Sequence, residues 1–252
     1  MEENKEVQGY KFPTEIIELP SKGLVYSEDN PLSSGKVEMK YMTAKEEDIL
    51  SNQSFIQKGV VLDKLLQSLI VSKVNYQDLI VGDKNAIMIA ARVLGYGKDY
   101  EFEYKGERVT VDLSILDNKP FDEASISQGQ NEFPFTLPAS GAVITYKLLT
   151  HKDEMAIEAE LRGLKKINKN ASPDVSTRLK HMILSVNGDS ERKTVREFVD
   201  TYFLAQDARS LRKHVTSNQP DIELTTQVEL IGGVEDIEIP ITVNFFWPDA
   251  TV

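Results

Sequence analysis

The chain has 252 residues, of which 40% are hydrophobic, and its 40 acidic and 29 basic residues give a formal net charge of −11. This length supports one large domain or two smaller ones. The acid excess disfavours nucleic acid as the main partner, because binding to phosphates depends on clustered Lys and Arg. The longest apolar runs, such as residues 87–91, are far shorter than the roughly 18 residues that cross a bilayer, so we expect no membrane partner.

The first ten residues are polar and acidic and do not resemble a signal peptide, so we expect the chain to stay in the cytoplasm of the cell that makes it. The chain has no cysteine, which excludes disulfides and thiolate zinc sites.

Residues 1–35 contain repeated Pro and Gly and predict an extended N-terminal arm with turns. The alternation of apolar and polar residues over 36–42 predicts a half-buried strand. Thr43 and Glu46 have the spacing of a capping box, which predicts that a helix begins there.

Two further helices are predicted in this half. Residues 60–71 carry a wide apolar face, and residues 83–94 follow Asp83 as an expected N-cap and stop at Gly95. Residues 100–113 then predict a β-ribbon with its turn at Lys105-Gly106, and the polar stretch 117–132 resembles a linker.

The second half has a similar order. Strands are predicted over 133–136 and 142–149, and Thr150 with Asp153 repeats the capping pattern of Thr43 with Glu46. Residues 172–174 begin a further helix that ends at Asn187-Gly188, more helices follow, and residues 228–241 predict a second ribbon that turns at Gly232-Gly233.

This order predicts an α+β protein with two related modules, each made of a strand, helices and a β-ribbon. We expect the arm at 1–35, the first module at 36–122, a linker at 123–132 and the second module at 133–252. An old duplication explains the repeated order, and chance recurrence of common capping chemistry is the alternative.

No catalytic, metal or cofactor site is predicted. The three histidines, His151, His181 and His214, lie on different predicted helices without short ligand spacing, and no phosphate-binding loop or nucleophile elbow is found. The acids at 46–48 fit the opening turn of a helix, and Asp236 with Glu238 fits the solvent face of a strand. We therefore expect neither an enzyme nor a small-molecule substrate.

Several segments, taken in order, resemble the T-even bacteriophage baseplate protein family, whose members include a hub subunit implicated in baseplate assembly. Each segment is short, but the ordered set covers nearly the entire chain: residues 18–23, 41–50, 81–86, 92–97 and 245–248. The resemblance implies a protein of the contractile tail baseplate, found in the host cytoplasm during assembly and in the tail baseplate if it remains in the virion.

The chain departs from that family in its two ribbons. Related proteins often carry Cys pairs at these turns, where this chain has Tyr104–Glu107 and Leu230–Gly233. These residues lack the soft ligands of a zinc ribbon, so the ribbons are expected to hold without metal, through cross-strand pairs such as Phe102 or Tyr104 with Val109 or Val111.

We therefore expect a non-enzymatic structural or assembly protein whose partners are other baseplate or hub proteins. A transient assembly chaperone absent from the finished virion is the close alternative, and a nucleic-acid-binding adaptor derived from a zinc ribbon is a remote one. Aromatic and aliphatic residues near the two ends are the predicted docking residues, because such side chains dominate interfaces: Phe12, Leu19, Leu24, Tyr26, Phe245, Phe246 and Trp247.

Overall fold

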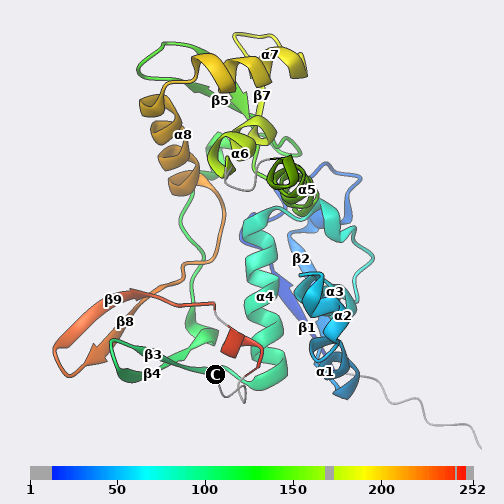
Figure 1. The fold of residues 1–252 in the computed structure, drawn as a ribbon. Helices are drawn as coiled ribbons and strands as arrows, with labels where there is room; N and C mark the ends of the chain where they lie inside the picture. Colours follow the sequence, from blue (N-terminus) through cyan, green and yellow to red (C-terminus); the bar gives the residue numbers. More distant parts are fainter. Residues whose placement is uncertain (1–12, 168–172, 242, 248–252) are drawn as a thin grey trace, which may run out of the picture.

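The computed structural model describes residues 13–167, 173–241 and 243–247, and it has the expected α+β fold (Figure 1). In the first half the helices and strands are, in chain order, β1 (Thr14–Glu18), β2 (Lys36–Lys40), α1 (Ala44–Leu50), α2 (Gln53–Gln57), α3 (Val61–Leu69), α4 (Val81–Tyr96), β3 (Asp99–Tyr104) and β4 (Glu107–Asp112). Predicted boundaries are close for the strand, the ribbon and the helix α3.

In the second half they are β5 (Phe133–Thr136), β6 (Val143–Tyr146), α5 (His151–Ile167), α6 (Asp174–Met182), β7 (Ile183–Val186), α7 (Arg192–Glu197), a π-helical turn (Phe198–Tyr202), α8 (Ala205–Asn218), β8 (Thr225–Leu230) and β9 (Gly233–Glu238). Strand β7 was not predicted: the segment expected to continue as helix to Asn187-Gly188 leaves the helix at Met182 and pairs with β6.

All strand pairs among the described residues are antiparallel, in the sheets β1-β2, β3-β4, β5-β6-β7 and β8-β9. In each half a hairpin-like strand pair leads into a capped helix, further helices follow, and a ribbon ends the half. The elements of the two halves thus follow a similar order, with the additional strand β7 in the second half.

The capped helices also match in detail. The Glu46 carboxylate accepts from the Thr43 backbone N–H at 3.0 Å and forms an ion pair with Lys40 at 2.8 Å. The Asp153 carboxylate accepts from the Thr150 N–H at 3.1 Å and pairs with Lys147 at 2.7 Å. Lysine, threonine and acid thus occur at the same spacing in both modules, and the predicted capping box is confirmed at α1.

The ribbons match as well. Each has two six-residue strands around a two-residue turn, and Tyr104 pairs with Glu107 as Leu230 pairs with Gly233. The backbone φ values of Lys105 (51°) and Gly106 (81°) are both positive, as a tight hairpin turn requires. The expected cross-strand pair of Phe102 with Val109 is present.

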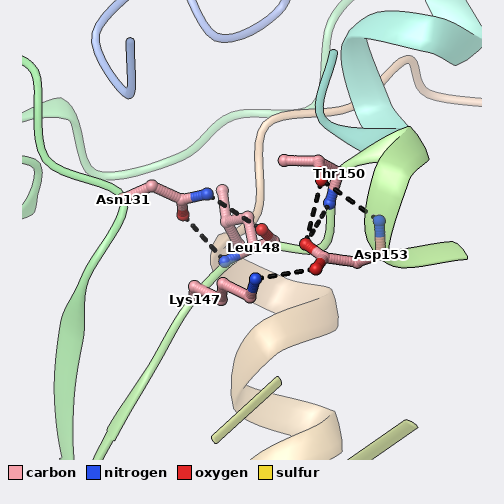
Figure 2. A network of polar contacts seen from close by, with 5 residues as sticks. All are labelled: Asn131, Lys147, Leu148, Thr150 and Asp153. Atoms are coloured by element: carbon pink, nitrogen blue, oxygen red, sulfur yellow. Dashed lines mark hydrogen bonds and ion pairs between the residues drawn. The ribbon is translucent and has the colours of Figure 1, made fainter. Parts of the chain in front are cut away.

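The expected linker is held by hydrogen bonds to the second module and to the arm. The Asn131 side chain accepts from the Leu148 N–H at 2.8 Å and donates to the Leu148 carbonyl at 2.9 Å. Figure 2 shows these contacts beside the Lys147–Asp153 ion pair. The Gly129 N–H donates to the Leu24 carbonyl at 2.7 Å, which joins this stretch to the arm. The arm pairs with β2 through β1, whose residues are mostly exposed, and it enters the core at Leu19.

Helix α4 runs through the middle of the molecule, with α1–α3 beside it and α5 beyond its first turn (Figure 1). The helix begins two residues earlier than predicted, with Ile80 as N-cap, and extends to Tyr96. The prediction that Asp83 is the N-cap is wrong. Asp83 lies in the first turn, and its fully buried side chain bonds to residues of the N-terminal arm instead.

Candidate functional site

The segments that carry the family resemblance converge around α4. The carboxylate of Asp83 accepts from the Ser21 N–H at 2.9 Å, from the Ser21 hydroxyl at 2.6 Å and from the Tyr26 hydroxyl at 2.6 Å. All three residues are buried, and burial raises the pKa of Asp83 above its ordinary value. The three donors offset the cost of burying a polar group and fix the arm on the helix.

The neighbouring Gly82 brings the second module against the same turn. A Cβ atom at Gly82 would lie 1.9 Å from the carbonyl oxygen of Pro220, so only glycine permits this approach without a backbone shift. The Asn85 side chain donates to the Asp221 carboxylate at 3.0 Å. The first turn of α4 therefore joins the arm, the first module and the segment that leads to the second ribbon.

The end of α4 organises the ribbons. The Arg92 guanidinium donates through Nη1 to the Gly97 carbonyl at 2.7 Å and through Nη2 to the Asp99 carbonyl at 3.1 Å, which fixes the turn from the helix into β3. Gly95, from the same resemblance segment, lies where a Cβ would be 1.9 Å from the Met42 sulfur.

The two ribbons lie side by side at this end of the molecule (Figure 1). The Lys105 ammonium pairs with the Glu235 carboxylate at 2.6 Å, and the Ile231 N–H donates to the Glu107 carboxylate at 3.0 Å. The Tyr100 hydroxyl donates to the Pro240 carbonyl at 2.9 Å. The modules thus meet through contacts between their ribbons as well as at the start of α4.

Most of the predicted docking residues do not lie on the surface. Leu19, Tyr26, Phe245 and Phe246 are at most 5% exposed, and the Phe245 ring packs edge-on against Tyr100 at a centroid distance of 5.0 Å. Their assignment to partner docking is therefore wrong for this conformation: these side chains close the chain's own core. For Phe245 and Phe246 the reason is that they pack on each other and Phe245 packs on Tyr100 of β3, where an aromatic side chain gains more from burial than from exposure.

Two of the remaining docking residues are partly exposed, and one lies outside the described residues. Leu24 and Trp247 both pack against the core without being fully buried. Phe12 falls in the part of the chain that the structure does not describe.

A groove lies beside β3. It has a volume of about 720 Å³ and is lined by five consecutive strand residues, Asp99–Glu103, together with residues of α4, of the ribbon and of the C-terminal segment: Arg92, Tyr96, Gly106, Arg108 and Asn244. Because successive side chains of a strand point to opposite faces, a groove lined by five in a row follows the edge of the strand.

This groove was not predicted from the sequence. Its residues come from the stretch 92–108 and from Asn244, which lies far away in the chain. Only the alternation of Asp99, Glu101 and Glu103 is visible in the sequence, where it indicates a solvent-facing side of a strand. That alternation is also the one signal that could have pointed to it.

The histidines have separate structural contacts. His151 lies 3.6 Å from the Asp63 carboxylate, His181 lies 3.0 Å from Glu160, and His214 stacks on Phe135 at a centroid distance of 4.5 Å. Within the ranges that the structure describes, no three His, Cys, Asp or Glu side chains are placed to hold a metal ion together. Over the same ranges, no helix is both long enough and apolar enough to cross a bilayer.

Comparison with protein families, with characterised proteins and with solved structures finds no match to this chain.

Proposed function

We propose that this chain is a non-enzymatic structural or assembly protein of a contractile phage tail baseplate hub, which acts by docking other baseplate or hub proteins. The observation that carries the proposal is the resemblance of five segments, in order, to the T-even baseplate protein family. The geometry of all five segments gives it support, because their residues have architectural roles.

Those roles are specific. Ser21 of the first segment bonds to Asp83 of the third, Glu46 of the second caps α1, and Arg92 of the fourth fixes the start of β3. Phe245 of the fifth packs on Tyr100. Residues that a family shares for its architecture are expected to hold elements in place, whereas residues shared for catalysis are expected to converge on a reacting group.

The proposed location is the host cytoplasm during assembly, and the tail baseplate if the chain stays in the virion. An affinity-tagged chain expressed during infection should co-purify with other baseplate or hub proteins. Recovery of host proteins alone, with no baseplate protein, would contradict the proposal.

Mass spectrometry of purified virions and of assembly intermediates separates the two forms of the function. A structural subunit is expected in both samples. A transient assembly chaperone is expected in the intermediates alone.

A further inference from the structure

The outer edge of β3 is open. Among the described residues β3 pairs with β4 alone. The Lys98 carbonyl points towards β4, because it accepts a hydrogen bond from the N–H of Leu113, the residue after β4. The next carbonyl, that of Asp99, points away from β4 and accepts from Arg92. Backbone groups of an antiparallel strand alternate in direction with a period of two residues, so the peptide groups of Glu101 and Glu103 face the same side as the Asp99 carbonyl. That side is the groove.

The groove also holds a hydrogen-bond donor and an acceptor without partners. Over the part of the chain that the structure describes, two buried side-chain polar atoms have no hydrogen-bond partner, the Arg92 Nε and the Asn244 Oδ1. Both residues line the groove, and Arg92 is only 3% exposed. Unpaired buried polar atoms are rare in folded proteins, and here they offer one N–H donor and one oxygen acceptor to an incoming group.

The charge of the groove favours a basic ligand. Asp99, Glu101 and Glu103 have exposed side chains along it. The nearest basic side chain on the ribbon, Arg108, reaches Glu101 at 4.0 Å, and Arg92 is occupied by two backbone carbonyls. A basic segment would therefore meet carboxylates that the described part of the chain leaves largely unpaired.

We propose that the groove binds an extended, basic segment of a partner protein, which adds to the open edge of β3 as a third strand. An extended segment supplies both N–H and C=O groups, which match the peptide groups of Glu101 and Glu103 and also the Arg92 Nε–H and the Asn244 oxygen. Its Lys or Arg side chains lie along the acidic side of the strand. The inference rests on the proposed docking function and names the kind of partner segment that the docking uses.

Amide hydrogen exchange measured by NMR on the full chain tests this proposal. The probes are a synthetic octapeptide of alternating lysine and threonine, the same peptide with glutamate in place of lysine, and the lysine peptide with N-methylated backbone. We expect the lysine peptide to slow exchange of the Glu101 and Glu103 amides, and the other two peptides to leave it unchanged. Unchanged exchange with the lysine peptide, or equal protection by the glutamate peptide, overturns the proposal.

Matched variants locate the site. Charge reversal by Glu103→Lys should weaken binding of the lysine peptide at least about tenfold, because it places a like charge beside the bound segment. Glu229→Lys makes the same change at an exposed position of β8, outside the groove, and should bind as the unmodified chain does. Asn244→Leu, which removes the unpaired oxygen, should also weaken binding. Equal affinity of the Glu103→Lys and Glu229→Lys chains overturns the assignment.

The peptide result and the co-purification result can fail separately. If the unmodified chain recovers baseplate proteins but the lysine peptide does not protect β3, the groove assignment is wrong and the docking function stands. If the unmodified chain recovers no baseplate protein, the proposed function is wrong, whether or not the lysine peptide protects the amides of β3.

Discussion

Tyr26 illustrates how single residues hold the arm in place. Its hydroxyl donates to Asp83 at 2.6 Å and accepts from the Ile80 N–H at 3.0 Å, so it completes the hydrogen bonding of a buried carboxylate and of the N-cap residue of α4. Burial raises the pKa of Tyr26 well above its ordinary value. The hydroxyl therefore remains protonated and keeps donating across the physiological pH range.

Tyr26→Phe is expected to lower the free energy of unfolding by about 1–3 kcal/mol, because it leaves the Ile80 N–H without an acceptor and removes a donor to Asp83. Tyr41→Phe is the matched control, since the Tyr41 hydroxyl donates to Glu15 in an exposed setting. Its cost is expected within roughly 0.5 kcal/mol. Urea unfolding measures both, and equal costs would contradict the role of Tyr26.

Glu160 gives a prediction about pH. Its carboxylate bonds to Arg196 at 2.7 and 2.9 Å and to His181 at 3.0 Å, and thus joins α5 to α6 and α7. The hydrogen bonds from Arg196 are the main cause that lowers the pKa of Glu160 from 4.5 to about 2. The unfolded state then binds more protons than the folded state within this window, so this contribution to stability is present above pH 4.5 and is lost as the pH falls towards 2.

Unfolding in urea at a series of pH values should show a shallower loss of stability between pH 4.5 and 2 for Glu160→Gln than for the unmodified chain. Glu158→Gln is the control on the same helix, where the side chain is 66% exposed and meets Arg162 at 3.8 Å. It should keep the slope of the unmodified chain. Identical slopes for all three proteins would exclude the proposed role of Glu160.

At the scale of elements, the two capped helices are the clearest sign of repetition. Both begin with a threonine whose hydroxyl donates to the acid three residues later, at 2.6 Å in α1 and 2.9 Å in α5, and a lysine three residues before each threonine pairs with that acid. The ends of α3 and α6 match as well, because the C-cap residues Ile70 and Ile183 pair with Met39 and Tyr146, which directly precede the two lysines.

Thr43→Val and Thr150→Val should each lower the free energy of unfolding by about 1 kcal/mol, the usual cost of losing an N-cap. Because the two caps share no partner, the double variant should lose the sum of the two costs within about 0.5 kcal/mol. Denaturant unfolding of the single and double variants provides the measurement. A larger difference between the cost of the double variant and the sum of the single costs would show that the two caps are energetically coupled.

At the scale of the whole molecule, the two halves meet at the start of α4 and at the paired ribbons. Gly82 is decisive at the first contact, because the Pro220 carbonyl occupies the space of a side chain. Gly163, in α5, offers a comparison within another helix, since a Cβ there would meet no atom within 4 Å.

Gly82→Ala should destabilise the chain by about 2 kcal/mol or more, because the backbone of the second half must move away from α4. Gly163→Ala should instead stabilise it by roughly 0.5–1 kcal/mol, as alanine is the better helix former. Thermal unfolding of the two variants should shift in opposite directions. A neutral Gly82→Ala would show that the close contact between the halves is absent in solution.

The sequence by itself determined the features that depend on neighbours in the chain. The capping box at Thr43, the ribbon turn at Lys105-Gly106 and the apolar face of α3 were predictable, because caps, tight turns and helical periodicity involve residues only a few positions apart. The repeated order of the two halves followed from these local signals.

The tertiary structure alone decided the rest. Asp83 is a residue type typical of an N-cap, but it binds Ser21 and Tyr26 from a distant segment. Phe245 and Phe246 are residue types typical of docking sites, but they are buried in the chain's own core. The groove beside β3 combines Arg92, Asn244 and a strand edge that no single segment contains. Which side chains become buried or left unpaired depends on contacts between residues far apart in sequence, and local patterns carry no information about those contacts.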